Sequence, residues 1–331
     1  MKPRVNRVMT LIRAYGAIAI TALLLALLPV VIHSNTVINA LVNAMIIGLV
    51  AQGWNLLAGY GGQFSFGHAA FFGVGAYGNA ILQVRYGVNA YAAMPVATGI
   101  GAAAGAAIGY LSFRSGLRGS YFALITLAFA EVFRIIANAT PMTGAAAGTL
   151  IKLQVSAANF QFASRAVYFW IILAFVIAAM LAVRAIERHR FGAYLVAVRE
   201  NENAAAALGV DTLGVKLKAI TISAGLAALA GAFYVQYFLF VDASIGFGSW
   251  ISIEALLAPI VGGLGTVFGP LLGALALYFL GEFAKAIAGR VAGIDLSLFG
   301  VLLVLVIAFA RHGLQGLLTR VSDAWRAGRP A

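Results

Sequence analysis

Cysteine is absent from this 331-residue chain, and charged residues make up only 10% of it. The lack of cysteine excludes disulfide bonds, thiolate metal sites and cysteine nucleophiles. Because 63% of the residues are hydrophobic, no stretch of domain size is polar enough to form a separate soluble domain. The alternating ten-residue segments that are typical of a transmembrane β-barrel are also missing.

The motifs of common enzymes are missing as well. No G-x-x-x-x-G-K-[ST] loop occurs, so the chain lacks a P-loop for ATP. It has no H-E-x-x-H, no G-x-S-x-G and no paired intramembrane aspartates. His68 has no second His, Asp or Glu at metal-ligand spacing, so we expect it to be a structural hydrogen-bonding group. The sequence therefore predicts no catalytic residue, no metal and no cofactor.

Long apolar runs recur along the whole chain. A run of about 18 or more apolar residues is typical of a transmembrane helix. We therefore predict an all-α, polytopic helical membrane protein with a single transmembrane domain over 1–331. About ten transmembrane or re-entrant segments are expected, near 14–33, 36–57, 62–83, 90–112, 119–138, 166–186, 215–240, 251–266, 268–288 and 295–311.

The net charge of +12 is explained by bases in the loops and tails beside the membrane, so it does not predict nucleic acid as a partner. With the N-terminus inside, sixteen Lys and Arg residues fall in cytosolic segments and six fall outside. Cytosolic loops of membrane proteins carry such an excess of bases. The distribution predicts that both termini are cytosolic.

A polar insert at about 187–214 interrupts the apolar sequence. It contains charged residues of both signs, the alanine run 204–207 and then Gly209. Alanine favours a helix, and glycine commonly ends one. We expect a short amphipathic helix on the cytosolic side, which would serve as a docking surface for a soluble partner.

Two segments, 59–78 and 259–274, are too rich in glycine to be ordinary spans. Glycine permits close helix packing or unwound backbone where protein or water surrounds it. Polar residues in membranes tend to face the interior of the bundle, so a substrate path is one interpretation of those in and near the first segment. Hydrogen bonds that only hold the helices together are the other. The predicted path residues are Asn55, Gln63, Ser65, Gly67 and His68.

Few ionisable residues remain within the spans. Glu131 with Arg134, and Glu282 with Lys285, are expected to be local ion pairs at i,i+3 spacing. Glu254 is left without a partner nearby in the sequence. A proton relay would need several unpaired acids, so this distribution argues against proton-driven transport and predicts a path without a fixed counter-ion.

Four blocks of the sequence together resemble the LivM-type permeases of branched-chain amino acid ABC transporters. They are GWNLLAGYGGQFSFGHAAFFGVGAY, LRGSYFALITLAFAEVFR, AVRENENAAAALGVD and IVGGLGTVFGPLLGA. The resemblance implies a second LivH-like permease subunit, two ATP-binding subunits and a periplasmic substrate-binding protein as partners. It also implies contact of the insert with the ATPase, at Arg199, Glu200, Asn201, Glu202, Ala205 and Gly209.

The expected function is therefore that of a permease subunit, without enzyme activity, of an ATP-driven importer in the bacterial inner membrane. The resemblance points first to branched-chain amino acids as cargo. Urea, short amides and aromatic acids remain alternatives, because similar permeases move them. A stand-alone transporter coupled to protons or sodium is the rival interpretation.

Overall fold

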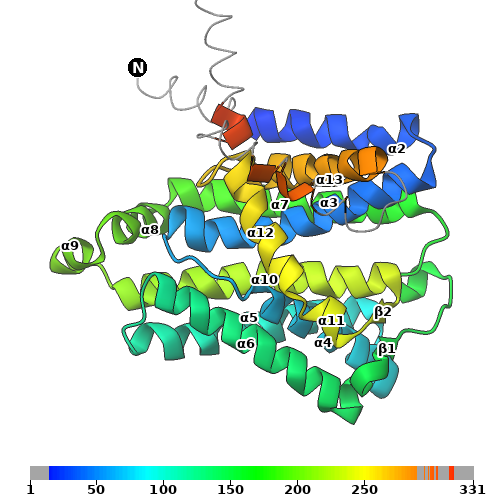
Figure 1. Ribbon diagram of the computed structural model, residues 1–331, viewed down its shortest axis with the longest axis horizontal. Helices are drawn as coiled ribbons and strands as arrows, with labels where there is room; N and C mark the ends of the chain where they lie inside the picture. The colour runs from blue at the N-terminus through cyan, green and yellow to red at the C-terminus, as the bar shows by residue number, and fades with distance from the viewer. Residues whose placement is uncertain are drawn as a thin grey trace, which may run out of the picture.

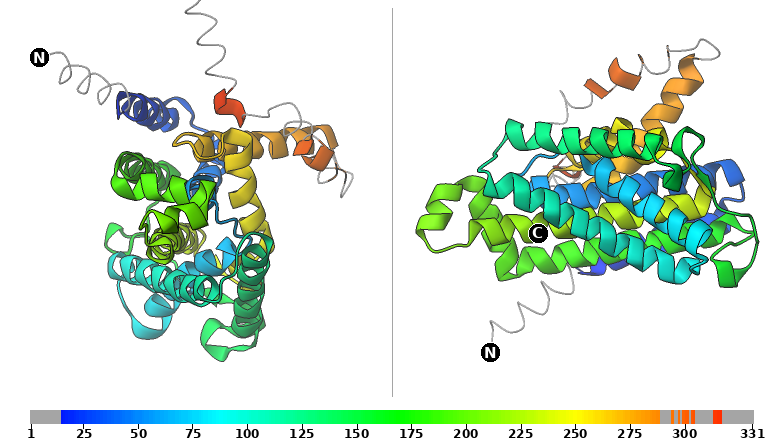
Figure 2. Two further views of the ribbon diagram at one scale, coloured as in Figure 1. Left: turned by 90° about the vertical axis from the view of Figure 1, so that its left-hand side faces the viewer. Right: turned by 90° about the horizontal axis from the view of Figure 1, so that it is seen from below.

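Helices account for most of the computed structural model, which describes residues 15–288, 294, 297, 299–301, 303–304 and 313–316. The long helices lie roughly side by side, and α12 crosses them at a steep angle (Figure 1; Figure 2). Within the described residues, seven helices are long and apolar enough to cross a membrane. The expectation of an all-α polytopic membrane protein is thus confirmed.

Among the described residues, the helices follow one another along the chain with two short strands between them. A first apolar helix covers Tyr15–Val31 and includes α2. The elements are α2 (Leu28–Val31), α3 (Asn35–Trp54), the π-helix η1 (Asn55–Tyr60), α4 (His68–Tyr86), α5 (Ala90–Arg114), α6 (Ser120–Ala139), the 3-10 helices η2 (Pro141–Thr143) and η3 (Ala145–Ala147), β1 (Thr149–Leu150), the 3-10 helix η4 (Ala157–Asn159), α7 (Arg165–Arg188), α8 (Arg190–Glu200), α9 (Glu202–Ala207), α10 (Thr212–Phe238), β2 (Phe240–Val241), α11 (Ala243–Gly246), α12 (Ser249–Gly262) and α13 (Gly269–Ala288).

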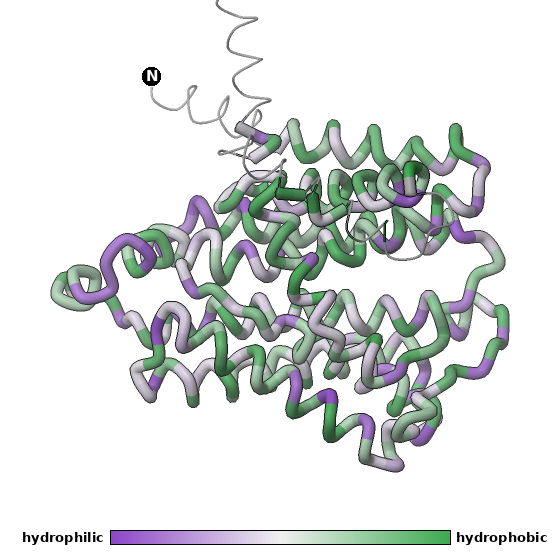
Figure 3. The backbone as a smooth tube through the Cα atoms, in the orientation of Figure 1, coloured by the Kyte–Doolittle hydropathy of each residue, from purple (hydrophilic) through white to green (hydrophobic). Residues whose placement is uncertain are grey.

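Polar residues concentrate at the two ends of the bundle, whereas the helices between them are largely apolar (Figure 3). One end carries α8 and α9 and is called the insert end here; the antiparallel pair of β1 and β2 lies at the opposite end. Arg118 lies at the insert end, where it pairs with Glu202. Arg85 lies at the opposite end and donates to the carbonyl of Pro141. These two bases lie at opposite ends of the bundle, and the side of the membrane that each end faces stays a prediction.

The helix α10 forms the centre of the core and packs against α3, α4 and α5. Glycines allow this close approach. A Cβ atom on Gly75 would collide with the backbone carbonyl of Ala228, and one on Gly231 with that of Phe72. Small residues at helix interfaces let backbones pack closely in membranes, where lipid gives no hydrophobic drive for helix association.

The first Gly-rich segment forms a broken crossing instead of a continuous span. The α3 helix runs antiparallel to α10, since the Tyr237 hydroxyl donates to Asn39 and Gly53 lies against Ser223. After η1 the chain returns without helical structure over 61–67, and α4 begins at His68 beside Ser223, in the middle of α10. The segment expected near 62–83 is thus helical only from His68 onward, and its Gly-rich start has the unwound backbone that glycine permits.

The chain between α10 and α12 repeats this arrangement in the opposite direction. After α10 it returns through β2 and α11, and α12 begins inside the bundle, where the Ser252 hydroxyl accepts from the N–H of Ala69. It ends near the insert end, where Gly265 lies beside Gly59. Each half thus contains a long helix, a return and a helix that begins within the bundle. The tenth expected span, 295–311, lies largely outside the described residues, as do both termini.

Candidate transport site

Two of the predicted path residues lie where the two broken crossings meet, and both are fully buried. The side chains of Ser65 and His68 are 0% exposed. The His68 ring is hydrogen-bonded through Nδ1 to the Ser65 hydroxyl at 3.1 Å and through Nε2 to the Ser223 hydroxyl at 2.8 Å. The Ser252 hydroxyl accepts from the N–H of Ala69 at 2.9 Å. We call Ser65, His68, Ser223 and Ser252 the central cluster.

The central cluster satisfies polar groups that a helix start would otherwise leave unpaired. The first N–H groups of an α-helix have no partner within the helix, and in a membrane only protein groups or trapped water supply one. The return before α4 is packed equally closely. The N–H of Phe66 donates to the Thr126 hydroxyl at 3.2 Å, and a Cβ atom on Gly67 would collide with the Thr126 backbone.

The other predicted path residues, Asn55 and Gln63, lie nearer the insert end. The Asn55 amide donates to the carbonyl of Thr266 at 2.9 Å and accepts from the N–H of Gly265 at 2.8 Å. Gln63 is buried, and its amide donates to the carbonyl of Gly61 at 3.2 Å. All five residues therefore make close contacts within the chain, and their role in a substrate path stays a prediction.

Asn55 also joins the two Gly-rich segments that stood out in the sequence. Gly59 lies directly against the backbone of Gly265, so these segments meet at the insert end. The segment that corresponds in structure to the break over 61–67 is 239–248, which leads from α10 to α12. The second Gly-rich segment, 259–274, instead forms the turn between α12 and α13 and the helix ends beside it.

Arg199 of α8 reaches the same junction. Its Nη1 donates to the carbonyl of Gly59 at 2.8 Å, and its Nη2 lies 2.7 Å from the carboxylate of Glu200. The Arg199 side chain packs against Gly62, where a Cβ atom would lie 2.7 Å from Cγ of the arginine. The φ of Gly62 is +68°, which also favours glycine. A predicted ATPase-coupling residue is thus in direct contact with the π-helix that ends the first long helix.

Glu202, another predicted coupling residue, ties α9 to the bundle. Its carboxylate accepts from Lys216 Nζ at 2.5 Å and lies 3.3 Å from Arg118 Nε. Lys216 Nζ also lies 4.9 Å from the centre of the Phe113 ring. Only 16% of the Glu202 side chain is exposed, so these contacts use most of it.

The remaining predicted coupling residues divide between structure and surface. The Asn201 side chain accepts from the N–H of Ala204 at 2.9 Å and begins α9, whereas Ala205 is buried beneath it. Gly209 ends the helix with a φ of +84°. Glu200 stays 67% exposed in its side chain. Beside Gly209, Leu208 is 86% exposed, an apolar group at the tip of the insert that sequence reasoning missed.

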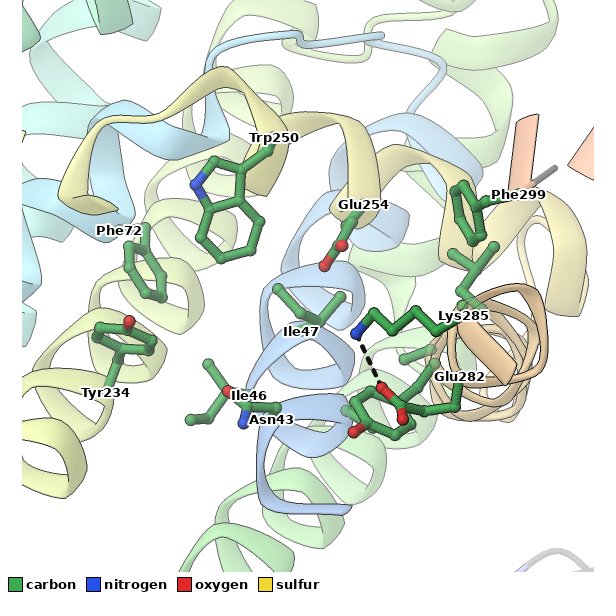
Figure 4. A pocket seen from close by; sticks show the side chains of 15 residues that line it. Asn43, Ile46, Ile47, Phe72, Tyr234, Trp250, Glu254, Glu282, Lys285 and Phe299 are labelled. Atoms are coloured by element: carbon green, nitrogen blue, oxygen red, sulfur yellow. Dashed lines mark hydrogen bonds and ion pairs between the residues drawn. The ribbon is translucent and has the colours of Figure 1, made fainter. Parts of the chain in front are cut away.

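A separate pocket of about 350 Å³ opens between α3, α10, α12 and α13. Figure 4 shows Glu254 and Lys285 directed into it from different helices, with Trp250, Phe72 and Tyr234 along one side. Lys285 Nζ donates to Glu282 at 2.9 Å. We call this space the α12–α13 pocket.

The sequence indicated this pocket only through Glu254. Glu254 had no partner within a few positions, but the fold brings Lys285 close enough for its charge to act on that carboxyl group. The aromatic and apolar walls come from segments far apart in the chain, which no local pattern connects. Among the described residues, no group of three or more His, Cys, Asp or Glu could hold a metal ion.

Comparison with known sequences gives a consistent assignment. Residues 36–307 match the family described as "Branched-chain amino acid transport system / permease component". The chain is 29% identical over 266 residues to the high-affinity branched-chain amino acid transport system permease protein LivM of Salmonella typhimurium, and equally to that of Escherichia coli. These matches cover 73% of this chain and 62% of each relative, so less than two thirds of the relatives' length is spanned.

A shorter match connects the chain to a permease with another named cargo. It is 35% identical over 133 residues to the autoinducer 2 import system permease protein LsrC of Salmonella typhi, covering 38% of this chain and 35% of that protein. No solved structure matches. The family match covers well over half of the chain and agrees with its helical membrane fold. The chain therefore belongs to the family of branched-chain amino acid transport system permease components, the non-catalytic transmembrane subunits of ABC transporters.

Proposed function

We propose that this chain is a permease subunit of an ATP-driven importer that moves branched-chain amino acids across the bacterial inner membrane. The observation that carries the proposal is the insert. Its exposed tip projects from one end of the bundle, and its Arg199 donates a hydrogen bond to the carbonyl of Gly59 inside the bundle. Such a segment connects a soluble partner to the membrane helices. The partners would be a second permease subunit, two ATP-binding subunits and a periplasmic substrate-binding protein.

The insert end would face the cytosol, with both termini on the same side. ATP-driven closure of the ATPase pair would push on the surface formed by Glu200, Leu208 and Gly209. Arg199 would transmit this movement to Gly59, and Asn55 would pass it to the turn between α12 and α13. Glu202 would act by holding α9 in place, because both of its charged partners belong to this chain.

Within this mechanism, Asn55, Gln63, Ser65, Gly67 and His68 would form the packed wall of the path. Their hydrogen bonds and close packing support a bracing role, since few of their polar groups are left to contact cargo. The family match and the LivM relatives support branched-chain amino acids as cargo. The LsrC relatives indicate that cargo differs among similar permeases, so urea, short amides and aromatic acids are tested as competitors.

Uptake into vesicles tests the proposal. The chain is co-expressed with its neighbouring transporter genes, and the purified complex is reconstituted with the binding protein outside and ATP inside. We expect leucine uptake that requires both ATP and the binding protein. Uptake driven by a proton or sodium gradient without ATP would instead support a stand-alone transporter. ATP-dependent uptake of only urea, amides or aromatic acids would correct the cargo.

The insert is tested separately by co-purification with the ATPase. Leu208→Asp changes an exposed side chain without disturbing the contacts of Glu202 or Arg199, and it should reduce ATPase recovery. Leu153→Asp is the matched control, because Leu153 is 68% exposed and follows β1 at the opposite end of the bundle. Equal ATPase recovery with both variants would argue against docking at the tip.

A further inference from the structure

The α12–α13 pocket combines charge of both signs with an apolar wall. Two carboxyl groups, Glu254 and Glu282, and one ammonium group, Lys285, border the same space. Phe72, Trp250 and Tyr234 supply aromatic surface. Its volume of about 350 Å³ lies at the lower end of the ~300–1,000 Å³ range of ligand pockets. The space is thus suited to a small molecule with separate polar and apolar parts.

Two of the charged groups of this pocket, Lys285 and Glu282 of α13, are exposed on the surface formed by the described residues. The side chains of Lys285 and Glu282 are 62% and 47% exposed. Charged groups within a membrane are expensive, and they almost always face the bundle interior or a water-filled cavity. This side of α13 is therefore suited to face water or another subunit, and not lipid.

Glu254 differs from Glu282 in how its carboxyl group is used. Glu282 accepts the hydrogen bond of Lys285. Among the residues that the structure describes, Glu254 has no hydrogen-bond donor or base at bonding distance, although the charge of Lys285 acts on it. An acidic group that is desolvated by an aromatic wall favours a cationic ligand group beside it.

We propose that the α12–α13 pocket binds the zwitterionic head of an apolar α-amino acid during transport. The ligand's ammonium group would donate to Glu254, and its carboxylate would accept from Lys285. Its side chain would lie against Ile47, Phe72 and Trp250. This inference rests on the proposed function, because it places the cargo of that importer at a specific site of this subunit.

The absence of cysteine allows a direct binding measurement that does not depend on uptake. Gly281 lines the pocket, and a Cβ atom there would meet nothing closer than the Phe299 ring at 3.9 Å. Gly281→Cys therefore places a single thiol in the pocket. Gly99→Cys is the matched control, since Gly99 is an exposed helical glycine with nothing within 4 Å of a Cβ atom. Alkylation of each thiol by a maleimide is timed in the purified transporter complex.

Leucine should slow alkylation of Gly281→Cys and leave Gly99→Cys unchanged. At a concentration about ten times its dissociation constant, occupancy should slow the reaction about tenfold. 4-Methylpentanoate is leucine without the ammonium group and isopentylamine is leucine without the carboxylate, so neither should protect at that concentration. Equal protection by isopentylamine would overturn the assignment of Lys285 to the carboxylate.

Glu254→Gln in the Gly281→Cys background identifies the group that binds the ammonium. Loss of one member of a buried, hydrogen-bonded charge pair should weaken leucine protection about 30-fold or more. Glu131→Gln is the control, because that acid pairs with Arg134 on the exposed face of α6. Unchanged protection by leucine in Glu254→Gln would overturn the proposal.

The same samples separate this inference from the proposed function. If Gly281→Cys supports ATP-driven leucine uptake but leucine gives no protection, the pocket assignment is wrong and the proposed function stands. If the wild-type complex takes up no leucine, the proposed function is wrong, and the pocket assignment is withdrawn with it.

Discussion

The central cluster and the α12–α13 pocket are both polar regions within a membrane bundle, yet they differ in how their groups are used. In the central cluster, the His68 ring is paired at both nitrogens with hydroxyl groups of the same chain. In the pocket, Glu254 and Lys285 face a cavity from different helices. Polar residues in a membrane therefore indicate a cargo site only where the fold leaves them accessible.

The largest effect on stability should come from adding a bulky side chain to the close-packed segment 61–67 before α4. Gly67→Leu forces a side chain into the backbone of Thr126, and overpacking costs about 1–3 kcal/mol, occasionally more. We expect little folded protein in the membrane and a strongly reduced melting temperature. Gly99→Leu is the matched control, since that position has open space. Equal stability of the two variants would show that the segment before α4 is not closely packed, and the contrast with the accessible pocket would then fail.

A second test asks whether the insert acts through the packed region. Arg199→Met removes the charge-assisted hydrogen bond to Gly59, a contribution of about 1.5–3 kcal/mol. If that contact carries the ATPase movement, leucine uptake should fall about tenfold or more while ATPase association stays intact. Lys218→Met, which removes an exposed base of α10, should leave uptake unchanged. Normal uptake in Arg199→Met would show that the contact between the insert and Gly59 does not transmit the ATPase movement.

His68→Gln tests how much the hydrogen bonds of the central cluster contribute to stability. An amide cannot reproduce the positions of both ring nitrogens, so one hydrogen bond to Ser65 or Ser223 is lost. The expected loss of stability is about 0.5–1.5 kcal/mol. Thermal unfolding of the purified protein measures it. A melting temperature equal to that of the wild type would mean that the cluster contributes little to the packed region.

The smallest effect concerns the ion pairs of Glu202. A double-mutant cycle of Glu202→Gln with Arg118→Met should give a coupling energy of about 0.2–1 kcal/mol, as for exposed pairs. The cycle with Lys216→Met should give more, because the Lys216 side chain is only 5% exposed. Unfolding midpoints of the variants provide the energies. A larger coupling with Arg118 would contradict the view that Lys216 is the main anchor of α9.

Local patterns predicted the long helices because each apolar run is read along a single segment. They also predicted the polar insert, whose alanine run and Gly209 form and end α9. The break at 61–67 was signalled by glycine density, but its position was not, because it depends on Thr126 and Ser223 in other helices.

The accessible pocket was beyond prediction for a similar reason. Glu254 and Lys285 are 31 positions apart, on two helices joined by a turn, so no i,i+3 or i,i+4 spacing connects them. The sequence therefore predicted a path without a fixed counter-ion, whereas the fold gathers three charged groups at one cavity. In the same way, the sequence did not indicate the bonds of Glu202 to Arg118 and Lys216, because these bonds depend on the fold. The contact of Glu202 with the ATPase, which the family resemblance implied, stays a prediction.

The most direct test of the difference between the two polar regions is the Michaelis constant for ATP-driven leucine uptake in Glu254→Gln and His68→Gln. Both variants are measured in the same reconstituted transporter, with unfolding recorded alongside. We predict that Glu254→Gln raises the Michaelis constant and keeps the wild-type melting temperature. His68→Gln should lower the melting temperature and leave the Michaelis constant unchanged. A raised Michaelis constant for His68→Gln, with none for Glu254→Gln, would contradict the account and place cargo at the central cluster.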